Sequence, residues 1–170
     1  ILVCLVGSEM CIRDSYEGNS FKRLTNLNND LLRGKDLGVI EEIWYNSSVD
    51  GRKIQGWIAK PPGFDKEKKY PLIVENHGGP ISNYGDRFSP EILLYSAAGY
   101  VVFYPNPRGS TSYGEEFGNL LYRNYPGDDY HDVMDGVDKM LELGYIDMEN
   151  LFVTGGSAGG IMTAWIIGKT

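Results

Sequence analysis

The chain has 170 residues, of which 42% are hydrophobic and 23% are charged, and its formal net charge at pH 7 is −7. This is the composition of an ordinary folded protein, and the length allows one domain with a sizeable buried core. The sequence has no run rich in Lys and Arg and no apolar stretch close to the ~18 residues of a membrane-spanning helix. We therefore expect neither a nucleic-acid partner nor a membrane span.

Residues 1–15 differ in character from the rest of the chain. Residues 1–6 are apolar, but no basic region precedes them and no small-residue cleavage site follows, so they do not match a signal peptide. Residues 5–15 (LVGSEMCIRDS) resemble the translation of an adapter used to prepare sequencing libraries. We predict that 1–15 is an artefactual segment and that native sequence begins near Tyr16; the alternative is a short native strand.

Both cysteines, Cys4 and Cys11, fall inside this segment. Their number therefore does not indicate a redox compartment. The localisation, whether cytoplasmic, periplasmic or secreted, stays open.

The elements expected along the chain form a regular series. Residues 16–38 are polar and predict irregular structure with at most one short strand. A β-hairpin follows, with strands at 39–45 and 53–60 joined through Asp50-Gly51. Three strand–helix units are then expected, with strands at 72–74, 100–104 and 151–154 and helices at 90–98, at 129–143 and from about 161. A hairpin followed by strand–helix repeats predicts an α/β fold with a parallel sheet.

The motif Gly155-x-Ser157-x-Gly159 has the spacing of a nucleophile elbow and lies between a predicted strand and a predicted helix. Such a turn is so sharp that the serine rises above the sheet, and glycines two residues before and after give it clearance. The alternative is an ordinary strand-to-helix turn in which the serine side chain caps the helix.

Acyl transfer also requires N–H donors directed at the developing oxyanion. The residue after the nucleophile, Ala158, would supply one backbone N–H, and an earlier strand-to-helix loop should supply the second. That earlier position holds His77-Gly78-Gly79-Pro80, whose small residues let a substrate carbonyl approach the main chain. Gly79 is our candidate for the second donor, with His77 and Gly78 supporting the loop. Two separate motifs thus occupy the two positions that one mechanism requires.

Four runs now resemble the prolyl oligopeptidase family of serine peptidases, in particular its acylaminoacyl-peptidase and dipeptidyl-peptidase-like branch. They are residues 76–80 (NHGGP), 106–114 (NPRGSTSYG), 132–138 (DVMDGVD) and 155–160 (GGSAGG). The resemblance implies a partial α/β-hydrolase domain over 39–170 and, over 16–38, the exit from a β-propeller. It also implies short peptides as substrates and no cofactor.

In an α/β-hydrolase the catalytic residues follow the chain order Ser, Asp, His. Residues 158–170 contain neither Asp nor His, so we expect the triad to be truncated and this chain alone to be inactive. His77 belongs to the oxyanion loop, where it more plausibly shapes the loop than accepts a proton. His131 lies at the start of a helix and is interpreted as part of a solvated turn.

Acidic residues gather around His131, and a metal site is the alternative interpretation of Asp128, Asp129, Asp132 and Asp135. Acidic side chains are favoured at any helix N-terminus, so we predict no metal. Arg108 is expected to anchor its loop to a carboxylate rather than to hold substrate. Met140 and Trp165 lie on apolar helix faces and are expected in the core.

The sequence therefore predicts a serine-type peptidase that forms an acyl-enzyme on Ser157 and acts on peptides. The alternatives are a carboxylesterase-like α/β-hydrolase, which uses the same elbow, and a non-catalytic fragment.

Overall fold

The computed structural model describes residues 14–25 and 29–170, and these residues divide into two compact units. The prediction for residues 1–13 lies outside the described residues. One unit comprises the described residues up to Asp36 together with 85–90, and the other comprises 37–84 and 91–170.

The first unit contains more regular structure than the polar sequence predicted. Strands β1 (Asp14–Glu17) and β2 (Ser20–Arg23) form an antiparallel hairpin, and α1 (Asn29–Leu32) is a single helical turn. The expectation of at most one short strand in 16–38 is therefore wrong. The turn explains the difference, because Gly18 and Asn19 both adopt positive φ values of 54° and 68°, which a two-residue hairpin turn requires.

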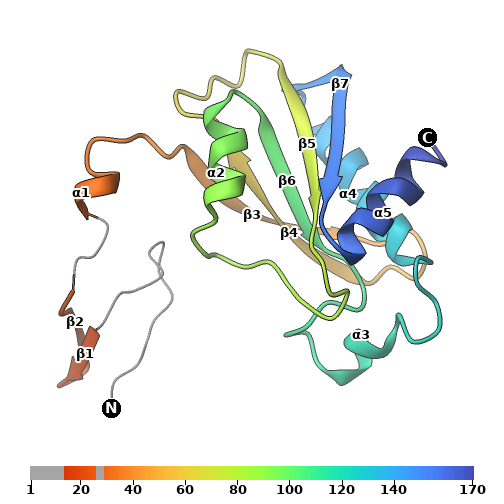
Figure 1. Ribbon diagram of the computed structural model, residues 1–170, viewed down its shortest axis with the longest axis horizontal. Helices are drawn as coiled ribbons and strands as arrows, with labels where there is room; N and C mark the ends of the chain where they lie inside the picture. The colour runs from red at the N-terminus through yellow and green to blue at the C-terminus, as the bar shows by residue number, and fades with distance from the viewer. Residues whose placement is uncertain (1–13, 26–28) are drawn as a thin grey trace. The chain divides into compact units, whose positions relative to one another are not determined.

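The second unit is built on a five-stranded mixed sheet with strand order β3-β4-β6-β5-β7 (Figure 1). The strands are β3 (Val39–Asn46), β4 (Lys53–Lys60), β5 (Tyr70–Asn76), β6 (Val101–Asn106) and β7 (Ile146–Gly155). The predicted hairpin of β3 and β4 is confirmed as an antiparallel pair, and β4 joins β6 antiparallel. Because β5 pairs in parallel with both β6 and β7, the carboxyl ends of these three strands meet at one edge of the sheet.

Helices cover the sheet on both faces. Figure 1 shows α2 (Pro90–Ala97) on one face and α4 (Asp129–Glu142) with α5 (Ala158–Ile167) on the other. The larger core lies on the α4 and α5 face and includes Leu72, Phe103, Val133 and Met140. The smaller core lies beneath α2. The α/β architecture predicted from the strand–helix repeats is confirmed.

Two details differ from the sequence predictions. A short helix, α3 (Glu115–Asn119), was not expected. Strand β7 is the edge strand among the described residues, and Leu151 and Phe152 are 43% and 48% exposed. Met140 is fully buried as predicted, whereas Trp165 is 40% exposed, because α5 lies at the same margin of the sheet. Within the described residues, no helix combines the length and the apolar character needed to cross a membrane.

Candidate active site

Ser157 lies between the end of β7 and the start of α5 in a backbone conformation that is costly for a residue with a side chain. Its φ is 56° and its ψ is −121°. Its side chain makes no capping hydrogen bond to α5, and the residue is exposed. A serine that served the turn as a helix cap would have an extended backbone and a hydrogen-bonded hydroxyl. The geometry is therefore that of a nucleophile elbow, in which strain presents the hydroxyl to solvent.

The two outer glycines of the motif are required by the packing around the elbow. A Cβ on Gly159 would lie 2.0 Å from the carbonyl oxygen of Asn76, and a Cβ on Gly155 would lie 2.7 Å from the same atom. The middle glycine, Gly156, has no atom within 4 Å of its Cβ position. Strand β5 therefore touches both the end of β7 and the start of α5, and only Gly155 and Gly159 permit that approach.

The glycine-rich loop after β5 lies directly against Ser157. A Cβ on Gly78 would be 3.3 Å from Cβ of Ser157 and 3.0 Å from the carbonyl oxygen of Gly156. Gly79 has a φ of 123°, and a Cβ there would meet the Ile81 nitrogen at 2.6 Å. The structure thus brings together the two motifs that the sequence placed 80 residues apart, and each glycine of the loop is there for a steric reason.

Two backbone N–H groups at this junction are available to a ligand. Ala158 is the first residue of α5, where helical N–H groups have no partner within the helix. Gly79 lies in the exposed loop. Within the part of the chain that the structure describes, neither N–H group has a hydrogen-bond acceptor. An oxyanion hole requires unpaired backbone donors, and these two residues directly follow Gly78 and Ser157, which lie against each other.

His77 shapes the loop through both of its ring nitrogens. Nδ1 lies 2.9 Å from the carbonyl oxygen of Gly78, and Nε2 lies 3.0 Å from Oγ of Ser110. The ring also packs edge-on against Tyr84, with the ring centroids 5.3 Å apart. Because these two contacts engage both nitrogens, the arrangement supports the predicted structural role of His77 rather than that of a general base for Ser157.

Arg108 is buried and anchors its loop, as the sequence predicted. Its Nε lies 2.9 Å from Oδ2 of Asp132, and its Nη2 donates to Oδ1 of Asp132 at 3.0 Å and to Oγ of Ser47 at 2.9 Å. These contacts raise the pKa of the guanidinium further, chiefly through its hydrogen bonds to Asp132. The loop after β6 is thereby tied to both the β3–β4 hairpin and α4.

The acidic residues at the start of α4 are not all solvated, which corrects the sequence interpretation. Asp132 and Asp129 are 0% and 1% exposed, whereas His131 is exposed as expected. Asp132 faces Arg108, and Asp129 accepts a hydrogen bond from the backbone N–H of Gly127 at 2.6 Å. Burial raises the pKa of Asp129 to about 6. Across the described ranges, no cluster of three or more potential metal ligands occurs.

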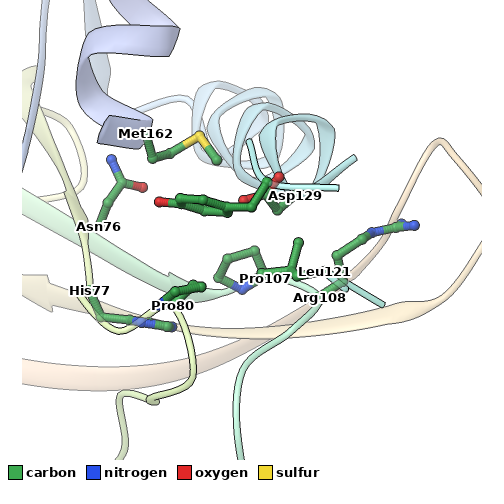
Figure 2. A pocket seen from close by; sticks show the side chains of 9 residues that line it. Asn76, His77, Pro80, Pro107, Arg108, Leu121, Asp129 and Met162 are labelled. Atoms are coloured by element: carbon green, nitrogen blue, oxygen red, sulfur yellow. The ribbon is translucent and has the colours of Figure 1, made fainter. Parts of the chain in front are cut away.

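A small cavity of about 20 Å³ lies between the glycine-rich loop and the two helices on that face. Figure 2 shows His77 and Pro80 on one side of it and Asp129 and Met162 on another. The space holds about one water molecule. Tyr125 also lines it and donates its hydroxyl hydrogen to the carbonyl oxygen of Ala158. From the sequence, neither Tyr125 nor Ser110 was predicted to lie near the site. For Ser110, the indication in the sequence was its position in the run 106–114, which follows a predicted buried strand.

Comparison with models of known protein families identifies the family of this chain. Residues 86–170, which include the whole elbow, match the prolyl oligopeptidase family. The chain belongs to the prolyl oligopeptidase family. Residues 37–127 also match the acetyl xylan esterase (AXE1) family, but that match ends before Ser157.

Similar proteins in this family are peptidases. The chain is 44% identical over 154 residues to the uncharacterized peptidase YuxL of Bacillus subtilis, covering 90% of this chain and 23% of that protein. It is 38% identical over 149 residues to dipeptidyl-peptidase 5 of Schizosaccharomyces pombe, covering 84% of this chain and 22% of that protein.

The fold matches solved peptidase structures equally well. An acylaminoacyl peptidase of Pyrococcus horikoshii superposes with a TM-score of 0.88 at 28% identity, over 97% of this chain and 26% of that one. The chain thus spans about a quarter of the length of these relatives. The partial α/β-hydrolase fold expected from the resemblance is confirmed.

Proposed function

We propose that this chain supplies the nucleophile and the oxyanion hole of a serine peptidase. In this mechanism the Ser157 hydroxyl oxygen attacks a peptide carbonyl carbon, and the resulting tetrahedral oxyanion accepts hydrogen bonds from the N–H groups of Gly79 and Ala158. A base outside these 170 residues takes the hydroxyl proton and passes it to the leaving nitrogen as the C–N bond breaks. The amine half of the peptide is released, and water then hydrolyses the acyl-enzyme left on Ser157.

The main observation behind this proposal is the strained, exposed conformation of Ser157. The serine side chain does not cap the helix that follows it, so capping does not explain the strain. The contact of Gly78 with Ser157 and the two unpaired N–H groups support the proposal. Family membership supplies the reaction class.

We further propose that the catalytic Asp and His come from polypeptide outside these 170 residues. Residues 158–170 contain neither residue type, and both ring nitrogens of His77 are engaged in its loop. A serine without a base is a weak nucleophile. No cofactor takes part in this mechanism, and a peptide is its substrate.

Labelling with a fluorophosphonate probe tests the assignment of the nucleophile. In the complete polypeptide that contains this chain, we expect Ser157→Ala to abolish both labelling and peptide hydrolysis. Ser48→Ala, which removes an exposed serine in the hairpin turn, should leave both unchanged. Persistent labelling of the Ser157→Ala variant would disprove the assignment. The 170-residue chain alone should not be labelled, and labelling at Ser157 would contradict the proposed absence of its base.

A carboxylesterase is the second candidate, because residues 37–127 match an esterase family. An ester and an anilide of the same acylated peptide distinguish the two. A peptidase hydrolyses both at the same titrated site, whereas hydrolysis of the ester alone would favour the esterase. Short peptides are the proposed substrate class, and one solved relative is an acylaminoacyl peptidase in complex with the tripeptide derivative Z-Gly-Gly-Phe-chloromethyl ketone.

A further inference from the structure

Two loops at the carboxyl edge of the sheet are joined along their length. One is the glycine-rich loop, residues 77–84, and the other is its neighbour, residues 106–113. The backbone N–H of Thr111 donates to the carbonyl oxygen of Ser82 at 2.8 Å, and the side chain of Asn83 donates to Oγ of Ser112 at 3.0 Å. The neighbouring loop therefore forms one wall of the glycine-rich loop.

Asn106 connects the two loops through two hydrogen bonds to one residue. Its side-chain Oδ1 accepts from the backbone N–H of Tyr84 at 2.7 Å, while its Nδ2 donates to the carbonyl oxygen of Tyr84 at 3.0 Å. The amide thus pairs with both backbone groups of one residue, as a neighbouring strand would. Asn106 is 0% exposed, and Nδ2 also donates to the Tyr113 hydroxyl at 2.6 Å. A two-point hydrogen bond fixes both the position and the direction of the segment it holds.

Ser110 holds the other end of the glycine-rich loop. It is 1% exposed, and its Oγ lies 3.0 Å from Nε2 of His77. The same Oγ lies 2.6 Å from the carbonyl oxygen of Pro107, so the hydroxyl is itself held within its own loop. Nδ1 of His77 contacts the carbonyl oxygen of Gly78 at 2.9 Å. Ser110 is thereby linked through one imidazole ring to the peptide group that lies against Ser157.

The neighbouring loop is a rigid support because Arg108 secures it. The backbone N–H of Arg108 donates to Oδ2 of Asp132 at 2.8 Å, in addition to the buried ion pair between the two side chains. Beneath the glycine-rich loop, Pro80 and Pro107 line the same small cavity, which has room for about one water (Figure 2). The glycine-rich loop is thus held at both ends by a loop that is itself anchored.

From these contacts we infer that Asn106 and Ser110 are positioning residues for the oxyanion hole, which rests on the proposed function of Ser157. Asn106 holds the carboxyl end of the glycine-rich loop at Tyr84, and Ser110 holds its start at His77. Together they keep the N–H of Gly79 directed at the oxyanion. Neither residue touches the substrate; each acts through the loop. A donor displaced by about 1 Å loses most of its effect on the transition state.

The experiment uses the complete polypeptide with three variants, Ser110→Ala, Asn106→Asp and Ser157→Ala. Asn106→Asp keeps the size and the acceptor but loses the donor to Tyr84. Matched controls are Ser96→Ala and Asn150→Ala. Ser96 is a buried serine on α2 whose hydroxyl has no hydrogen-bond partner among the residues that the structure describes, and Asn150 is an exposed asparagine in β7. Active-site titration with a fluorophosphonate gives the concentration of competent enzyme, so a variant that folds poorly is still measured per site.

For Ser110→Ala and Asn106→Asp, we expect kcat per titrated site for an acylated peptide anilide to fall about 10- to 100-fold. KM should change less than about threefold, because ground-state binding does not use the oxyanion hole. Inhibition by a peptide aldehyde, whose adduct carries an oxyanion, should weaken in parallel with kcat. Inhibition by the corresponding peptide alcohol should not change, and both control variants should match the parent.

The inference is overturned if the two variants lose titratable sites but keep kcat per site within about twofold, since that result describes stability alone. The inference is also overturned if inhibition by the peptide aldehyde and inhibition by the peptide alcohol weaken by the same factor. Failure of the proposed function looks different, because Ser157→Ala would then retain hydrolysis whatever the other variants do.

Discussion

The carbonyl oxygen of Asn76 occupies the place where a side chain on Gly159 would begin. A Cβ on Gly159 would lie 2.0 Å from that oxygen and 2.9 Å from the carbonyl oxygen of His77. The end of β5 therefore rests directly on the first turn of α5, and the glycine-rich loop starts from this contact. The lack of a side chain at Gly159 thus links the position of Ser157 to the position of the loop that lies against it.

Gly159→Ala should therefore destabilise the protein strongly, whereas Gly156→Ala should not. Neither backbone oxygen can move without shifting a strand or the loop, so we expect a loss of about 3 kcal/mol or more for Gly159→Ala. Gly156 has open space at its Cβ position and should change stability by less than about 0.5 kcal/mol. Urea unfolding at low protein concentration measures both, and equal stabilities would contradict the packing argument.

The buried ion pair between Arg108 and Asp132 predicts a second pair of contrasting variants. Arg108 is 3% exposed and Asp132 is fully buried. Arg108→Ala therefore leaves a buried carboxylate without its cation, and Asp132→Asn leaves the buried guanidinium only its longer contacts with the partly exposed Asp50 and Asp128. We expect Asp132→Asn or Arg108→Ala to cost about 3 kcal/mol or more in the free energy of unfolding. Arg52→Ala removes an exposed pair with Glu116 and should cost less than about 1 kcal/mol. Similar losses for the buried and exposed pairs would refute this account.

The sequence predicted the order of elements and the elbow because these depend on local patterns. Apolar runs such as 101–104 predict buried strands, and a serine between glycines predicts a sharp turn. The burial of Asp129 and Asp132 was not predictable in this way. Their local pattern is that of a solvated helix start. Asp132 is buried against Arg108, which lies 24 residues away in the chain, and Asp129 is buried where it accepts a hydrogen bond from the backbone N–H of Gly127.

The contacts of Asn106 and Ser110 within the site were also not predictable from local sequence patterns. Their roles depend on contacts with Tyr84 and His77, which follow a neighbouring strand in the sheet. Strand order decides these contacts, and neither composition nor spacing reveals which loop lies beside which. The exposure of Trp165 was mispredicted for a related reason, because an apolar pattern shows which side chains avoid water but not where the sheet has its edge.

Glu75 predicts a pH dependence of stability. It lies in β5, 7% exposed, with Oε2 lacking a partner among the described residues and Oε1 3.4 Å from the Tyr84 hydroxyl. Burial, followed by the nearby charge of Glu91, raises the pKa of Glu75 to about 7. The folded state therefore binds this proton more tightly than the unfolded state, so stability falls as pH rises from about 4.5 to about 7.

Glu75→Gln should remove this dependence, because the amide cannot ionise. We expect the variant and the parent to have similar stability at pH 4.5, and the variant to be more stable by up to about 3 kcal/mol at pH 8. Asp129, with a pKa of about 6, adds a slope of the same sign to both proteins, so the difference isolates Glu75. Glu67→Gln, at a carboxylate whose side chain is 80% exposed, should follow the parent. Parallel stability curves for Glu75→Gln and the parent across this pH range would contradict the prediction.

The outer edge of β7 predicts self-association of the 170-residue chain. Among the described residues no strand pairs with this edge, and Leu151 and Phe152 are roughly half exposed beside an apolar groove of about 370 Å³. Unpaired backbone groups next to apolar side chains promote pairing between copies. We expect light scattering after size exclusion to show concentration-dependent oligomers, and Leu151→Lys with Phe152→Lys to shift the chain toward monomer. Val49→Lys, at an apolar residue in the hairpin turn with 42% exposure, should not have this effect. A monomeric parent chain at high concentration, or equal rescue by Val49→Lys, would show that β7 is not the surface responsible.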